Sequence, residues 1–197
     1  NTLNKVIKFS KSKEIKKGRL IYCPPYTLIS SFYKKFENCL IDIGAQNCHE
    51  SDSYGSHTGS INSSMLKSVG ANYVILGHSE NRKKGETDKL INLKIKSAIK
   101  AKLKVIFCIG ETLVERKRGK TRLIISKQIR LGLDKIKKRP NIFIAYEPVW
   151  SIGTGHIPKP KELEQIVKFI KKKFKGKSPK ILYGGSVSPQ NISDLKK

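Results

Sequence analysis

The chain has 197 residues, enough to bury one sizeable hydrophobic core, so we expect a single domain over residues 1–197. Hydrophobic residues make up 38% of it, and its apolar runs are only a few residues long, which excludes membrane-spanning helices of about 20 residues. The cysteines form no C-x-x-C pair, a pattern that favours reduced thiols and a cytoplasmic location; they are Cys23, Cys39, Cys48 and Cys108.

The formal net charge of +26 has two interpretations. A basic chain can be a nucleic-acid-binding module, or it can carry a solvated coat of lysines on its outer helices. Lysines such as Lys94, Lys96 and Lys100 lie inside helical patterns and do not alternate with aromatic residues. This favours the coat and no nucleic-acid partner, with a basic, non-enzymatic nucleic-acid-binding module as the alternative. RNA binding measured at several salt concentrations separates the two, because phosphate contacts give a steep salt dependence.

Short apolar runs alternate with helical patterns along the whole chain. The runs predict strands over residues 19–23, 40–45, 73–76, 105–109, 142–146 and 180–183. The helical patterns lie near residues 2–17, 26–36, 62–69, 87–102, 121–138, 160–174 and 189–196. Continuous apolar strands separated by helices indicate an α/β fold with a parallel sheet covered by helices.

The strand predicted at 142–146 ends in a carboxylate, Glu147, and a loop with Pro148 near one end and Gly155 near the other follows it. Burial can raise the pKa of such a carboxylate towards neutrality, and a mobile loop can close over it and exclude water. The pattern predicts a catalytic base beside a lid. Alone, a carboxylate at a strand end is more often paired with a lysine.

Two further strand ends carry polar groups. His78 follows the apolar run 73–76 and Gly77, and the residues from Ser79 onward can begin a helix whose N-terminal dipole disfavours an imidazolium ion. We therefore expect a neutral histidine that donates a hydrogen bond. After the run 180–183 come Gly184, Gly185 and Ser186, where glycine permits close backbone approach to an anion. A Gly-Gly-Ser sequence alone is often only a turn.

Three stretches together resemble the triosephosphate isomerase family, and they occur in its order. They are Ala-Tyr-Glu-Pro-Val-Trp-Ser-Ile-Gly-Thr-Gly at 145–155, Tyr-Val-Ile-Leu-Gly-His-Ser-Glu at 73–80 and Ile-Leu-Tyr-Gly-Gly-Ser at 181–186. The resemblance implies a (βα)8 TIM barrel that is incomplete, with strands two to seven present in one truncated domain. It also implies that the catalytic lysine and the last phosphate loop lie outside residues 1–197.

The family interconverts dihydroxyacetone phosphate and D-glyceraldehyde 3-phosphate through an enediol(ate), in glycolysis and gluconeogenesis, without metal or cofactor. The resemblance implies that Glu147 is the base and His78 the electrophile, with Glu80 beside them as a third catalytic residue. It implies that backbone groups bind the substrate phosphate, at Gly153, Gly184, Gly185 and Ser186. A polypeptide of residues 1–197 alone is then weakly active or inactive. The runner-up among enzymes is another phosphate-binding βα-barrel isomerase or aldolase.

Residues 55–59, Gly-Ser-His-Thr-Gly, resemble the family loop that inserts into a partner subunit. The resemblance therefore implies a homodimer formed through the loop around Thr58. The chain departs from the family pattern at Ser60 and Asn81, where charged residues are common, and this leaves the strength of the interface open.

Overall fold

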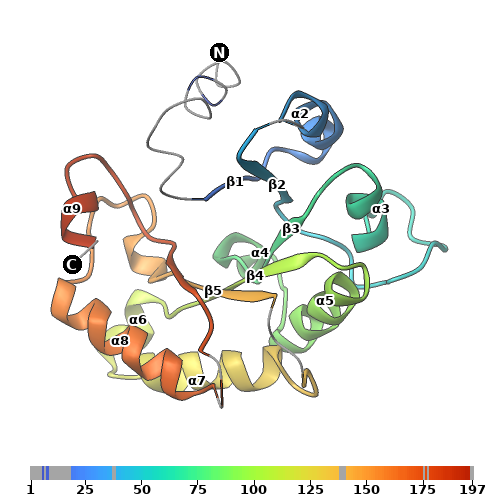
Figure 1. Cartoon of the computed structure of the whole chain (residues 1–197). Helices are drawn as coiled ribbons and strands as arrows, with labels where there is room; N and C mark the ends of the chain where they lie inside the picture. Colours follow the sequence, from blue (N-terminus) through green and yellow to red (C-terminus); the bar gives the residue numbers. More distant parts are fainter. Residues whose placement is uncertain are drawn as a thin grey trace. The chain divides into compact units, whose positions relative to one another are not determined.

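The structure is a computed structural model (Figure 1), which describes residues 6, 8, 19–36, 39–137, 141–174, 176 and 178–195. The helix predicted over 2–17 lies outside these ranges except at residues 6 and 8. The sheet has the strand order β1-β2-β3-β4-β5-β6, which is the order of the sequence. The contacts of the chain divide it into two compact units, 1–76 with 93–105 and 77–92 with 106–197.

The first unit contains three strands that pair in parallel. β1 (Leu20–Tyr22) pairs with β2 (Ile41–Ala45), and β2 pairs with β3 (Tyr73–Leu76). A 3-10 turn η2 (Tyr26–Leu28) leads into α2 (Ile29–Phe36), which packs on β2. α3 (Ser63–Ser68) precedes β3 and begins at Asn62, whose side chain accepts a hydrogen bond from the backbone N–H of Met65.

The second unit contains the ends of the later strands. β4 (Lys104–Ile109) crosses the boundary between the units, as does α5 (Asp88–Lys100). β5 (Ile142–Tyr146) pairs in parallel with β6 (Ile181–Tyr183). The helical elements here are α4 (Ser79–Lys83), α6 (Leu113–Lys117), α7 (Thr121–Gly132), η3 (Val149–Ser151), α8 (Pro160–Lys172) and α9 (Ile192–Leu195).

The carboxyl ends of β4, β5 and β6 are joined by backbone hydrogen bonds. The N–H of Glu147, just after β5, donates to the carbonyl of Ile109 at the end of β4 over 2.8 Å. The N–H of Gly184, just after β6, donates to the carbonyl of Tyr146 over 2.8 Å. Polar residues that follow these strands are therefore held side by side.

The predicted strands match the observed strands to within about two residues at each end, and two helices differ from the sequence prediction. α7 ends at Gly132 and not at residue 138, because Lys135 adopts φ +59°, a left-handed conformation that ends an α-helix. α6 was not predicted. It has a sequence signal, since Thr112 and Glu115 form a capping box in which each side chain caps the other residue's backbone N–H.

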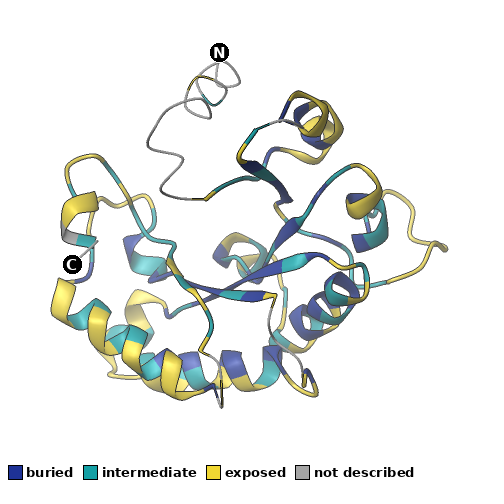
Figure 2. Cartoon of the chain, viewed as in Figure 1, coloured by how far each residue is buried: buried dark blue, intermediate teal, exposed yellow. Residues whose placement is uncertain are grey.

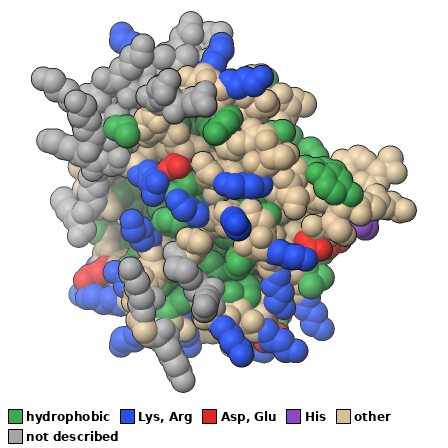
Figure 3. All heavy atoms as spheres, turned by 45° about the vertical axis from the view of Figure 1, so that its right-hand side comes forward, with side chains coloured by type: hydrophobic (Ala, Val, Ile, Leu, Met, Phe, Trp, Pro, Cys, Tyr) green, Lys and Arg blue, Asp and Glu red, His purple; other side chains and the backbone are tan. Residues whose placement is uncertain are grey.

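Most residues of β2, β3, β4 and β5 are buried, whereas β1 and β6 contain no buried residue. The helices α7 and α8 expose their outer faces (Figure 2). Figure 3 shows Lys and Arg side chains spread over the displayed face with few acidic ones among them. Lys94 does not belong to such a coat: it is only 6% exposed, and its ammonium group donates to Oδ1 of Asn47 over 3.3 Å. Among the described helices, none is long and apolar enough to cross a membrane. The prediction of a single domain stays a prediction.

Candidate active site

His78 is oriented by the first turn of α4. It is the N-cap residue of that helix, and its Nδ1 atom accepts a hydrogen bond from the backbone N–H of Glu80 over 3.3 Å. A ring nitrogen that accepts a hydrogen bond carries a lone pair, so this bond favours the tautomer with its proton on Nε2. Nε2 lies 3.5 Å from Oε1 of Glu147. The helix predicted to begin after His78 is confirmed.

Glu147 is a nearly buried carboxylate, only 5% exposed. Its Oε2 atom accepts a hydrogen bond from the backbone N–H of Ser79 over 3.3 Å, and the side chain of Cys108 also hydrogen-bonds to the carboxyl group. With His78 at Oε1, both carboxylate oxygens have polar partners. The carboxylate is therefore fixed in position although little of it contacts solvent.

Two opposing effects act on the acidity of Glu147. Burial raises the pKa of its carboxyl group above the ordinary value of 4.5 and is the largest effect. His78, the side chain of Cys108, the backbone N–H of Ser79 and Arg82 lower it by smaller amounts. The net direction is upward, which makes Glu147 a stronger base than an exposed glutamate.

Gly184 allows this packing around Glu147. A Cβ atom at position 184 would lie 2.6 Å from Cγ of Glu147, closer than real Cβ contacts allow. Any larger residue would push the carboxylate away from His78. The first glycine of the Gly-Gly-Ser sequence is thus required by the position of the carboxylate.

The loop predicted as a lid, the lid loop, comprises residues 148–158. Ser151 joins this loop to the turn after β6. It is fully buried, and its Oγ atom donates to the carbonyl of His156 over 2.5 Å. The same Oγ lies 2.9 Å from the hydroxyl of Tyr183. The hydroxyl of Ser186 in turn donates to the carbonyl of Ser151 over 2.5 Å. These bonds hold the base of the lid loop against the end of β6.

The residues predicted to bind phosphate do not all meet at one point. Gly184 lies against Glu147, and a Cβ atom on Gly185 would collide with Tyr183 and Ser151. Ser186 bonds to Ser151. These three residues therefore lie near the start of the lid loop. Gly153 lies at the exposed part of the lid loop, with φ +70° and open space around its α-carbon.

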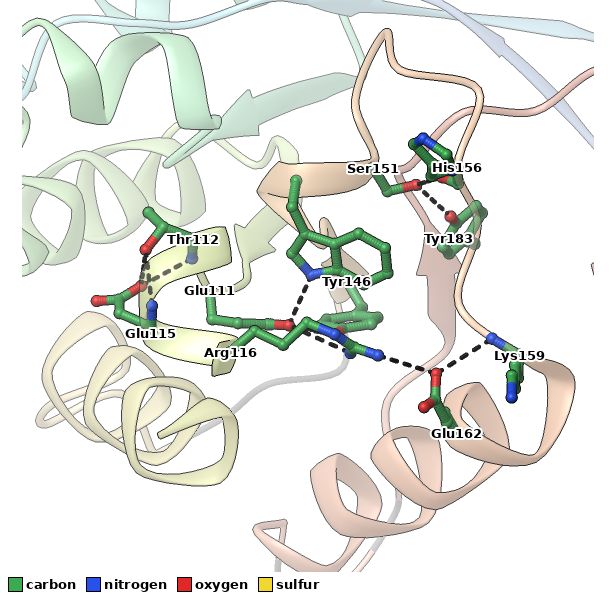
Figure 4. Close-up of polar contacts among 11 residues, drawn as sticks. Glu111, Thr112, Glu115, Arg116, Tyr146, Ser151, His156, Lys159, Glu162 and Tyr183 are labelled. Carbon is green, nitrogen blue, oxygen red and sulfur yellow. Dashed lines mark hydrogen bonds and ion pairs between the residues drawn. The ribbon is translucent and has the colours of Figure 1, made fainter. Parts of the chain in front are cut away.

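A second polar cluster anchors both ends of the lid loop (Figure 4). Glu111, fully buried after β4, accepts hydrogen bonds from the Tyr146 hydroxyl over 3.1 Å and from the Trp150 indole N–H over 3.0 Å. Arg116 lies 4.0 Å from Glu111 and donates to Glu162 over 3.0 Å. Glu162 also accepts from the backbone N–H of Lys159, where the lid loop enters α8.

Sequence reasoning assigned no role to several of these groups. Ser79 and Ser151 lie within the family-like stretches, but only the structure shows that they contact Glu147 and Tyr183. Cys108 and Glu111 are buried, and nothing in their local sequence distinguishes them from ordinary packing residues. Glu80 was predicted as catalytic. Its backbone N–H holds His78, while its carboxylate is exposed and makes no hydrogen bond or ion pair within the described part of the chain. Within the same residues, no group of three or more His, Cys, Asp or Glu side chains is arranged to hold a metal ion.

A buried carboxylate with a raised pKa, facing an imidazole at the ends of sequential βα units, is an arrangement suited to acid–base chemistry in an enzyme of the βα-barrel class. Comparison with known proteins identifies the family. A family model described as triosephosphate isomerase matches residues 1–197. The triosephosphate isomerase of Dictyoglomus thermophilum is 42% identical over 194 residues, 93% of this chain and 78% of the relative.

Two further relatives agree. The triosephosphate isomerase of Carboxydothermus hydrogenoformans is 42% identical over 193 residues, covering 93% of this chain and 76% of that protein. The crystal structure of triosephosphate isomerase from Bartonella henselae superimposes with a TM-score of 0.82 at 37% identity, covering 90% of this chain and 74% of that one. The chain belongs to the triosephosphate isomerase family, an enzyme family of aldose–ketose isomerases. The predicted fold class, an incomplete (βα)8 barrel, is confirmed.

Proposed function

We propose that the chain carries the proton-transfer machinery of triosephosphate isomerase, which interconverts dihydroxyacetone phosphate and D-glyceraldehyde 3-phosphate. Glu147 removes a proton from C1 of dihydroxyacetone phosphate while Nε2–H of His78 donates to the carbonyl oxygen. The enediol(ate) forms, and the proton returns at C2 to give the aldehyde. A glutamate base with a neutral histidine is already established for triosephosphate isomerase.

The observation that carries this proposal is the placement of Oε1 of Glu147 3.5 Å from Nε2 of His78. The raised pKa of the glutamate favours proton abstraction near neutral pH, and the Glu80 N–H bond keeps the histidine proton on Nε2. We assign Glu80 a positioning role on that bond.

Backbone groups are proposed to bind the substrate phosphate. The phosphate would contact the backbone amides of Gly153, Gly184, Gly185 and Ser186. The three glycines have no side chain to block its close approach, and that of Ser186 is small. The hydrogen bond between Ser186 and Ser151 supports this proposal, because it joins the turn after β6 to the lid loop. Closure of residues 148–158 would bring Gly153 to the phosphate and exclude water.

A triose phosphate substrate places the activity in glycolysis and gluconeogenesis, and we propose a cytoplasmic location. The sequence has no C-x-x-C pair among its four cysteines, and this pattern supports the proposal.

The test compares two polypeptides. We propose that the family's catalytic lysine has no counterpart within residues 1–197. Losing one preorganised electrostatic donor typically costs about 10²–10³ in rate. We expect weak activity from that polypeptide and restored activity from a chimaera in which residues 1–197 replace the matched portion of the Dictyoglomus thermophilum protein.

Glu147→Asp in the chimaera should lower kcat about 10²-fold or more by withdrawing the carboxylate, whereas the exposed control Glu164→Asp should not. Equal rates for Glu147→Asp and its parent would refute the assignment of the base.

Assembly is proposed to follow the family, as a homodimer through the loop around Thr58. Residues 52–59 are exposed, Tyr54 is 70% exposed, and a short turn is closed by the Ser60 N–H donating to the His57 carbonyl over 2.9 Å. Light scattering of the chimaera should give a dimer that dissociates when residues 55–60 are deleted. A dimer unaffected by the deletion would contradict this interface.

We also propose a single folding domain, which requires that both compact units unfold in one transition.

A further inference from the structure

A hollow of about 500 Å³ is lined by residues of α7, by the turn after it and by Lys173 at the end of α8. The two helices pack against each other (Figure 1). Its volume falls in the range of about 300–1,000 Å³ that is usual for small-molecule sites. None of its lining residues belongs to the proposed active site. A ligand bound here would therefore not compete with the triose phosphate for the same groups.

The inner wall of the hollow is apolar. Ile129 and Leu133 line it and are 5% and 1% exposed, so their side chains face the hollow from the protein core. Leu123 lines it from the first turn of α7 and is 63% exposed. Leu123, Ser126 and Arg130 stand at positions i, i+3 and i+7 of α7, which share one helix face. The hollow therefore has an apolar surface that a ligand can cover.

The rest of the lining is strongly basic. Lys127, Arg130, Lys135 and Lys173 contribute to it, and Asp134 is the one acidic residue among the lining residues. Within the described ranges, none of these four cations makes an ion pair with a carboxylate. The ammonium of Lys173 lies 4.8 Å from the centre of the Phe169 ring, which keeps this charge near the hollow. Four cations against one carboxylate leave a positive charge around the hollow, and a bound anion reduces the repulsion among the cations.

We propose that this hollow binds a small organic anion with an apolar body, such as a sulfonate, carboxylate or phosphate group on an aromatic or aliphatic skeleton. The apolar body lies against Leu123, Ile129 and Leu133, and the anionic group is held by Arg130 and Lys173. A nucleic acid would use the cations but not the buried apolar wall. The combination of a limited volume with that wall favours a small ligand.

The proposal is tested with 8-anilinonaphthalene-1-sulfonate as the probe and the 197-residue chain as the receptor. We expect saturable binding to one site. N-Phenyl-1-naphthylamine, which lacks the sulfonate, and inorganic sulfate, which lacks the apolar body, should each bind about tenfold more weakly or worse. Amide chemical shifts in ¹⁵N spectra should change on adding the probe, chiefly at residues 123–135.

Charge-reversal variants separate the site from the general basicity of the surface. Arg130→Glu and Lys173→Glu should each weaken probe binding about tenfold. Lys83→Glu and Lys89→Glu make the same change in net charge at exposed lysines outside the hollow and should leave binding unchanged. Equal weakening by all four variants, shift changes confined to other residues, or sulfate binding as tightly as the probe would overturn the proposal. Displacement of the probe by a single-stranded RNA, to the same extent in all four variants, would also overturn the proposal, because it would show binding to the basic surface in general.

Discussion

The guanidinium carbon of Arg116 lies 4.3 Å from the centre of the Trp150 ring, and the same guanidinium donates to Glu162. One side chain of α6 therefore contacts Trp150 near the start of the lid loop and Glu162 beyond its end. Because Trp150 is the single tryptophan of the chain, its fluorescence reports directly on this contact.

Arg116→Leu should loosen the base of the lid loop. It removes the stacking on Trp150 and the bond to Glu162, and it leaves the buried carboxylate of Glu111 without its nearest cation. We expect Trp150 emission to shift to the red and its anisotropy to fall. Arg118→Leu, an exposed arginine at the end of the same helix, is the matched control. Identical spectra for both variants would contradict the anchoring role of Arg116.

Glu147→Gln should raise stability at neutral pH while greatly slowing proton transfer. Burial raises the pKa of Glu147 above 4.5, so ionisation costs more in the folded state than in the unfolded state. The stability contributed by the protonated carboxyl is full below pH 4.5 and is lost as pH rises through the raised pKa. Urea unfolding should therefore show the variant more stable than the parent at pH 8, with the difference shrinking towards pH 4.5.

In the control, the pKa of the glutamate is shifted in the opposite direction. Glu164 is exposed and its pKa is lowered by its bond to Lys168, so Glu164→Gln removes a weak stabilising pair and should not raise stability at pH 8. In the chimaera, kcat for Glu147→Gln should fall about 10³-fold or more. A variant less stable than the parent at pH 8 would show that burial does not dominate the environment of Glu147.

Gly184→Ala should impair catalysis more than folding. The added methyl group would lie 2.6 Å from Cγ of Glu147, and the carboxylate must move to admit it. A shift of about 1 Å is enough to cost about 10²-fold in kcat. Full activity of the Gly184 variant in the chimaera would refute the packing argument.

Tyr183→Phe should weaken the attachment of the lid loop without changing the packing of the ring. The substitution removes the hydrogen bond of 2.9 Å between the Tyr183 hydroxyl and Ser151. If this bond supports the phosphate-binding turn, KM for the triose phosphate in the chimaera should rise several-fold, as expected for loss of one hydrogen bond of about 1 kcal/mol. Unchanged KM and kcat would show that the other bonds of Ser151 are sufficient.

Much of this site was predictable because its residues follow strands directly. The apolar runs 73–76 and 142–146 place His78 and Glu147 at strand ends, and parallel strands bring such ends to one edge of a sheet. The capping signal at His78 is equally local. Sequence alone therefore determined the α/β class, the strand positions and the pair of acid–base candidates.

The tertiary structure decided which distant residues surround that pair. The hydrogen bond from Cys108 to Glu147, the packing of Gly184 and the contacts of Ser151 with Tyr183 join segments far apart in the chain. The same holds for the burial of Lys94, which helical periodicity placed on a solvated face. Hydrophobic pattern specifies the buried face of each element. Partners within that face depend on register and close packing, which no local pattern contains.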